Sequence, residues 1–115
     1  MFGLTENSKY YFYTGSVDMR NGINGLYKLV KNEMGLIPIS GDIFIFFSRT
    51  RNNVKLLKWD GDGFLLYQKR LEKGTFERPL YNTESNSFSL SWDTFSMIMR
   101  GVSLTSIRYR KRLRI

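Results

Sequence analysis

The sequence predicts an α+β fold, with an antiparallel sheet, a central hairpin, one long N-terminal helix and a shorter C-terminal helix packed on it. Aromatic residues make up 16% of the 115 residues, which favours a pleated sheet as the core. Short apolar runs bounded by turn residues recur through the middle of the chain. Near the N-terminus, apolar residues instead recur at helical spacing. This length predicts a single domain over residues 1–115, with a basic C-terminal tail at about 105–115.

The first expected elements are a strand and a helix. Residues 9–14, K-Y-Y-F-Y-T, are a short aromatic run that predicts a strand. Asp18 is then placed to cap the first turn of a helix, and apolar residues follow at three- and four-residue steps until Gly35 ends it. Gly22 and Gly25 share one face of this helix, where a missing side chain suits the close approach of another backbone.

Three further strands are expected at residues 42–47, 54–60 and 63–73. Between the last two, Gly61-Asp62 fits a two-residue hairpin loop with glycine at its first central position. That loop fixes the opposed pairs as Trp59–Phe64, Lys58–Leu65, Leu57–Leu66, Leu56–Tyr67, Lys55–Gln68 and Val54–Lys69. Both faces of the hairpin are then partly apolar, so we expect the second face to be covered by the later helix or by another subunit.

The last third of the chain begins with an irregular polar stretch, residues 74–91, which predicts a long surface loop with a short strand at 88–90. Residues 91–101 predict the second helix, with Ser91 as its N-cap and Gly101 as its end. No apolar run has the length of a membrane span, and the N-terminus lacks the pattern of a signal peptide. We therefore expect a cytoplasmic protein.

The residue inventory argues against a catalytic centre. The chain contains no cysteine and no histidine, which excludes disulfides, Cys/His zinc sites and histidine-assisted nucleophiles. Asp60 and Asp62 flank a glycine, but turn chemistry accounts for them and two carboxylates are too few for a calcium or magnesium site. We expect no enzyme activity, cofactor or metal, and a metal-dependent nuclease at these two residues is the weakest alternative.

The net charge of +8 is unevenly distributed. Residues 1–48 hold four basic and four acidic residues, whereas residues 49–115 hold 14 basic and six acidic residues. Such an excess is typical of proteins with a polyanionic partner, such as nucleic acid. The alternative is a soluble protein that is simply basic.

The C-terminal tail is the first candidate nucleic-acid site. Its basic side chains suit phosphate contacts and its tyrosine suits stacking on a base. The alternative is a terminal strand with Ile107 and Tyr109 packed inward, or a frayed end. The candidate residues are Arg108, Tyr109, Arg110, Lys111, Arg112 and Arg114.

The hairpin and its flanking loops are the second candidate nucleic-acid site. Long basic side chains in an exposed connection can reach a phosphate backbone, although nothing in their spacing indicates base reading. The alternative is a solvated rim with weak ion pairs, for example from Glu72. The candidate residues are Arg49, Arg51, Lys55, Lys58, Lys69, Arg70 and Lys73.

Two blocks of sequence resemble a known family. Residues 17–26, V-D-M-R-N-G-I-N-G-L, resemble its helix signature, and residues 41–76 contain K-L-L-K-W-D-G-D-G-F followed by K-R-L-E-K-G-T-F. These blocks resemble the insertion-sequence accessory proteins, the second reading frame of IS-sixty-six-type transposable elements. That family is called TnpB-like, and it is distinct from the RNA-guided nuclease that shares the label.

The resemblance implies a bacterial mobile-element protein encoded beside the transposase, which is its implied partner. It supplies no catalytic residues, because strand transfer belongs to the other subunit. We expect a non-catalytic accessory protein that supports transposition by binding DNA, the transposase or both. The alternative is a pure protein-interaction module without DNA contact. It would form a homodimer or dock the transposase through the apolar second sheet face and the Gly22/Gly25 surface.

Overall fold

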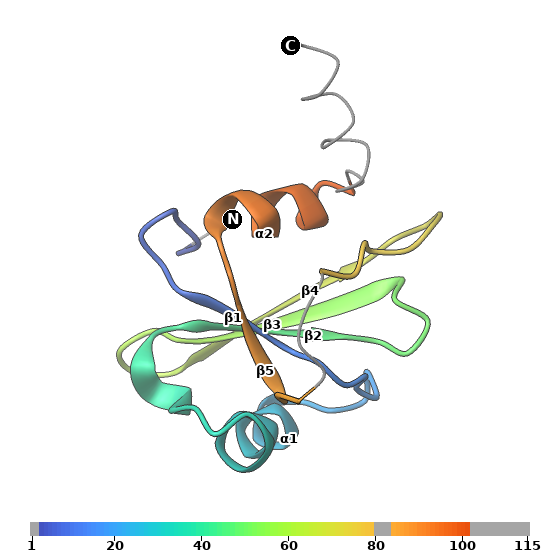
Figure 1. Ribbon diagram of the computed structural model, residues 1–115. Helices are drawn as coiled ribbons and strands as arrows, with labels where there is room; N and C mark the ends of the chain where they lie inside the picture. The colour runs from blue at the N-terminus through green and yellow to red at the C-terminus, as the bar shows by residue number, and fades with distance from the viewer. Residues whose placement is uncertain (1–2, 80–83, 102–115) are drawn as a thin grey trace.

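A computed structural model describes residues 3–79 and 84–101 and contains one five-stranded sheet with a helix on each face (Figure 1). The strand order is β4-β3-β2-β1-β5. The elements are β1 (Tyr10–Tyr13), α1 (Ile23–Lys28), its π-helical continuation η1 (Leu29–Glu33), the 3-10 turn η2 (Pro38–Ser40), β2 (Ile43–Phe47), β3 (Asn53–Trp59), β4 (Phe64–Arg70), β5 (Ser87–Leu90) and α2 (Trp92–Met99). The predicted α+β class is confirmed.

The sheet is mixed, so the prediction of an antiparallel sheet was wrong. Strands β1 and β2 run parallel, with Tyr10 opposite Ile43 and Phe12 opposite Ile45. The other three neighbouring pairs are antiparallel. The reason is the helix between β1 and β2, because a helical crossover returns the chain to the end from which the first strand started.

The central hairpin has the predicted register, from Trp59 opposite Phe64 to Val54 opposite Lys69. The amide of Asp60 donates a hydrogen bond to the Gly63 carbonyl at 2.8 Å. Gly61 at the first central position has φ +83°, a conformation that favours glycine. The local turn chemistry therefore fixes this part of the sheet.

The N-terminal helix is shorter than predicted. Helix α1 contains six residues and η1 five, and the helix begins after Gly22, four residues later than a cap at Asp18 would place it. The carboxylate of Asp18 instead accepts a hydrogen bond from the Arg20 amide at 2.8 Å. The backbone carbonyl of Asp18 accepts another from the Asn21 amide at 3.0 Å. Asp18 therefore caps a turn and not the helix. Gly35, at φ +67°, ends the helical segment as predicted.

The glycines of α1 do not contact another backbone among the described residues, contrary to expectation. A Cβ atom at Gly22 would meet nothing within 4 Å, and one at Gly25 would meet the side chain of Asn21. Gly22 is also the residue before the helix and not part of it. Gly25 therefore leaves room for the Asn21 side chain of the preceding turn, whereas Gly22 has open space beside it.

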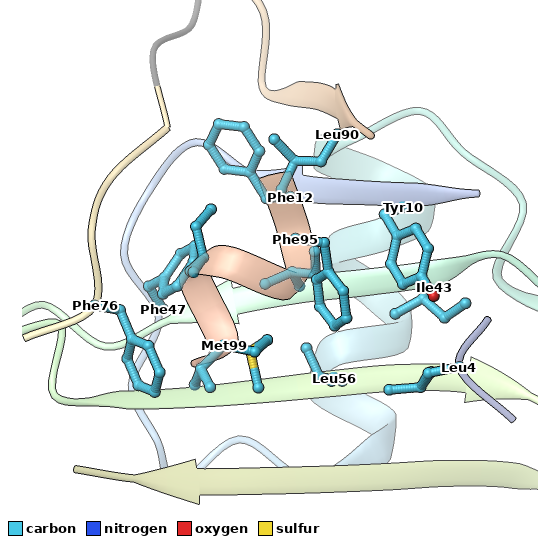
Figure 2. Packing of buried hydrophobic residues seen from close by; sticks show 13 residues of the cluster. Leu4, Tyr10, Phe12, Ile43, Phe47, Leu56, Phe76, Leu90, Phe95 and Met99 are labelled. Atoms are coloured by element: carbon cyan, nitrogen blue, oxygen red, sulfur yellow. The ribbon is translucent and has the colours of Figure 1, made fainter. Parts of the chain in front are cut away.

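Two apolar clusters cover the two faces of the sheet. Leu26, Val30 and Met34 of α1 and its continuation pack on one face. On the other face, Phe95 and Met99 of α2 point onto the strands, as Figure 2 shows. Every residue of β2 is buried, because this strand is covered on both sides. The prediction that the second face would be covered is confirmed, and the later helix covers it.

Helix α2 begins and ends where the sequence predicts. The Ser91 hydroxyl accepts a hydrogen bond from the Thr94 amide at 3.1 Å, and Gly101 adopts φ +76° after the last turn. The short strand predicted at 88–90 is β5, which pairs with β1. Among the described residues, no helix combines the length and apolarity that a membrane span requires.

Candidate functional site

The two ends of the sheet carry opposite charge. Strands β1, β2 and β4 run in one direction, so the segments after them meet at the same end. At that end, segments 48–53 and 69–79 hold six basic and two acidic residues, and we call this end the basic edge. At the opposite end, segments 3–9, 41–42 and 58–63 hold four acidic and two basic residues.

Backbone hydrogen bonds hold the two segments of the basic edge together. The Leu71 amide donates to the Asn52 carbonyl at 2.7 Å, and the Phe76 amide donates to the Arg51 carbonyl at 2.6 Å. The guanidinium of Arg51 donates to the Phe76 carbonyl and lies 5.9 Å from the centre of the Phe47 ring. Arg51 therefore joins the two segments from the inside.

Four of the seven hairpin candidates are exposed at this edge, namely Arg49, Lys69, Arg70 and Lys73. The ammonium group of Lys69 donates to the Met99 carbonyl at 2.6 Å, which ties β4 to the C-terminal end of α2. Gly101, the last described residue, thus lies close to the basic edge. The tail candidates at 108–112 and 114 follow it in sequence and lie outside the described residues.

Lys55 and Lys58 lie apart from these four residues. Lys55 is only 6% exposed, and its Nζ donates to the carbonyls of Met19 and Asn21 at 2.7 Å each. The Lys58 side chain is 15% exposed and lies 3.7 Å from the carboxylate of Asp60 at the acidic end. The structure therefore gives Lys55 a role inside the fold and places Lys58 at the far end of the hairpin.

An exposed ion pair precedes α1 and was not identified in the sequence as a site. The Asp18 carboxylate accepts hydrogen bonds from both the Arg20 side chain, at 2.7 Å to its nearest nitrogen, and the Arg20 amide. These hydrogen bonds lower the pKa of Asp18 from 3.8 to about 2. The signal available in the sequence was an Asp two residues before an Arg, which is too common to be diagnostic.

We expect replacement of Arg20 by Gln to raise the pKa of Asp18, because it removes the side-chain donor that contributes most to the lowering. The pKa is depressed in the folded state, so the contribution of this pair to stability is present above pH 3.8 and is lost as pH falls through about 2. Carboxyl-carbon NMR titrations measure the midpoint. Lys28→Gln serves as the control, and an unchanged midpoint in Arg20→Gln would contradict the assignment.

A groove runs between α2 and strands β3 and β4, and we call it the α2 groove. Its first hollow has a volume of about 280 Å³ and is lined by Val54, Leu56, Tyr67, Gln68, Lys69 and Met99. Its second hollow has a volume of about 400 Å³ and is lined by Lys69, Trp92, Phe95, Ser96, Met99 and Arg100. The sequence gives no signal for this groove, because its shape depends on where α2 crosses the sheet.

The two carboxylates considered as a metal site lie in the hairpin turn. Asp60 and Asp62 flank Gly61, and the Asp60 carboxylate faces the ammonium of Lys58. Within residues 3–79 and 84–101, no three metal-ligating side chains come together. The geometry of this turn therefore matches its sequence signature for a hairpin.

Comparison with known proteins gives a family match over most of the chain. The family described as IS66 Orf2-like protein matches residues 8–109. The uncharacterized protein y4jC of Sinorhizobium fredii (strain NBRC 101917 / NGR234) is 32% identical over 108 residues, covering 94% of this chain and 91% of that protein. The uncharacterized protein y4hO of the same strain is 31% identical over 97 residues, covering 84% and 83%. No solved structure matches.

Proposed function

The chain belongs to the IS66 Orf2-like protein family, and from this premise we propose that it is a non-catalytic accessory protein of a bacterial transposable element that binds DNA. The contact surface we propose is the basic edge together with the C-terminal tail. The observation that carries this proposal is the convergence of exposed Arg49, Arg70 and Lys73 at one end of the sheet. The described chain ends near the same place, and the basic residues of the tail follow it in sequence.

The chemistry of this surface suits phosphate groups. Arg49 lies in the loop after β2, Arg70 is the last residue of β4, and Lys73 follows three residues later. Side chains of this length on an exposed edge can contact the DNA backbone without reading bases. We therefore propose that the protein contacts DNA independently of its sequence. Another component of the element would then fix the position of the complex along the DNA.

The non-catalytic part of the proposal follows from the family and from the inventory of reactive groups. The chain has no histidine or cysteine to serve as base, nucleophile or soft metal ligand. Its basic residues at the exposed edge can bind and orient a polyanion but cannot cleave it. Strand transfer is then the task of the transposase subunit.

We expect the triple variant Arg49→Gln, Arg70→Gln, Lys73→Gln to bind duplex DNA more weakly and with less salt dependence. The slope of log K against log[salt] is negative, and each lost phosphate contact reduces its magnitude by about 0.9. Three lost contacts therefore reduce it by up to about 3. Fluorescence anisotropy with a labelled duplex at several NaCl concentrations measures both quantities. Circular dichroism confirms that the variant is folded.

The matched control is Lys9→Gln, Lys28→Gln, Lys31→Gln, which changes the net charge equally at exposed positions away from the basic edge. If the control weakens binding as much as the first variant, overall charge and not the basic edge is responsible. DNA binding without salt dependence would contradict the proposal. Truncation after Ile107 measures the contribution of the tail separately.

The alternative function is a protein-interaction module without direct DNA contact. The observation that favours it is the apolar α2 groove beside the basic edge. This function predicts that the basic-edge variant and the wild type bind the transposase equally, and that neither binds duplex DNA at low salt. The two functions differ in the DNA contact alone, because Arg49, Arg70 and Lys73 are not among the residues that line the groove.

A further inference from the structure

We propose that the α2 groove binds an extended acidic peptide segment of a partner protein, with two apolar side chains seated in its two hollows. This inference goes beyond DNA binding and does not depend on it. Three features of the groove favour such a ligand, namely its apolar floor, the charge of its rim and the open edge of β4.

The floor of the groove is apolar and firmly held. Leu56 of β3 and Phe95 and Met99 of α2 are buried in the cluster between helix and sheet. Trp92 and Tyr67 are half-buried and contribute aromatic surface to the walls. Both hollows have room for a large apolar side chain, which gains free energy by leaving water. Because both hollows contact Lys69 and Met99, two neighbouring anchors can enter side by side.

The charged residues that line the groove are all basic. Lys69 and Arg100 lie at its rim, and no carboxylate is among the described residues that line either hollow. The ammonium of Lys69 is held by the Met99 carbonyl, and a lysine has further N–H donors to offer. A ligand with carboxylates beside its apolar anchors is therefore electrostatically matched to the groove.

The same charges disfavour other occupants. The C-terminal tail of this chain holds five basic residues and no acidic residue, so it would be repelled by Lys69 and Arg100. The phosphates of DNA would pair with the basic side chains at the rim, but the apolar floor would then be covered by polar sugars and phosphates. A peptide that is both acidic and apolar meets both requirements.

The open edge of β4 favours an extended ligand. Strand β4 is outermost in the sheet, and no strand among the described residues pairs with its outer side. Tyr67, Gln68 and Lys69 of this strand also line the first hollow. A peptide added beside β4 would form backbone hydrogen bonds and would direct alternate side chains towards α2.

The test is an NMR titration of the ¹⁵N-labelled full-length protein with the peptide Glu-Glu-Phe-Glu-Leu-Glu-Glu and with a counterpart carrying Lys for each Glu. We expect the acidic peptide to shift the amides of Tyr67, Ser96 and Met99, which line the groove and lie outside the basic edge. The basic counterpart should bind about fivefold to tenfold more weakly, because it meets two like charges at the rim. Equal binding of the two peptides, binding of neither, or shifts outside the groove would overturn the proposal.

Two variants locate the charge effect. Arg100→Glu should weaken binding of the acidic peptide by about tenfold, whereas the matched control Lys31→Glu, an exposed position on the other face of the sheet, should leave it unchanged. An Arg100→Glu variant that binds as well as the wild type would overturn the proposal. The amide spectrum away from the groove shows that each variant is folded.

A DNA competition separates this inference from the proposed DNA contact. We expect a short duplex to shift amides of the basic edge without displacing the acidic peptide from the groove. The variant Arg49→Gln, Arg70→Gln, Lys73→Gln should keep full affinity for the peptide. A duplex that displaces the peptide and shifts the groove amides would assign the groove to nucleic acid, and would overturn the peptide proposal.

Discussion

Replacement of Phe95 by alanine is expected to lower the free energy of unfolding by about 3–5 kcal/mol. Phe95 is 2% exposed and its ring stacks on Tyr10 of β1, with 4.3 Å between ring centres. Alanine would remove this contact and leave a cavity between α2 and the sheet, because the strands beneath cannot move to fill it. Urea denaturation followed by circular dichroism measures the change.

The control for Phe95→Ala is Ile37→Ala, because Ile37 is also apolar but 67% exposed. Its removal is expected to change the free energy of unfolding by less than about 0.5 kcal/mol. A loss below about 1 kcal/mol for Phe95→Ala would mean that α2 is not firmly packed on the sheet. That result would also remove the wall of the α2 groove and with it the peptide site.

The parts of the fold that could be predicted from sequence are those set by neighbouring residues. Gly61 and Asp62 fix the hairpin register, because a two-residue loop permits only one pairing of its flanking strands. Ser91 and Gly101 likewise bound α2 through contacts within one helical turn. Such signals lie within a few residues of the structure that they determine.

The errors arose where distant residues decide between two local structures. Asp18 has the sequence context of a helix cap, yet it closes a turn. That turn is fixed by Lys55, whose ammonium binds the Met19 and Asn21 carbonyls from 36 and 34 residues away. The parallel pairing of β1 and β2 is equally non-local. The sequence predicts a strand, a helix and a strand in that order, but this order alone does not determine which strands pair in the sheet.

The candidate site was predicted in part for the same reason. The bias of positive charge towards residues 49–115 points to the segments that form the basic edge, because charged side chains are mostly exposed. Arg51 and Lys55 are exceptions that turn inward to backbone carbonyls far away in sequence. Amino-acid composition does not distinguish such inward-facing basic residues from exposed ones, and only the folded structure does so. The α2 groove depends entirely on packing and left no pattern in the sequence.

Replacement of Lys55 by methionine is expected to lower the free energy of unfolding by about 2–4 kcal/mol. The two hydrogen bonds from its ammonium are charge-assisted, and each is worth about 1.5–3 kcal/mol. The burial of an apolar group in place of a charge offsets part of this loss. Methionine keeps the length of the side chain, so the change isolates the hydrogen bonds that hold the turn before α1. Urea denaturation measures the loss of stability.

The control is Lys58→Met on the same strand. The ammonium of Lys58 lies 3.7 Å from the half-exposed carboxylate of Asp60. At that distance and exposure, this pair is worth about 0–1 kcal/mol, so the loss should be smaller. Equal losses for the two variants would contradict the structural role of Lys55.

The Lys55→Met variant also decides whether Lys55 belongs to the DNA surface. If Lys55 acts inside the fold, the folded variant should bind duplex DNA with the wild-type salt dependence while its stability falls. If Lys55 instead contacts a phosphate, the magnitude of the slope of log K against log[salt] should fall by about 0.9, with little change in stability. The two outcomes separate, because Lys55 is only 6% exposed and its ammonium is held inside the fold by the Met19 and Asn21 carbonyls.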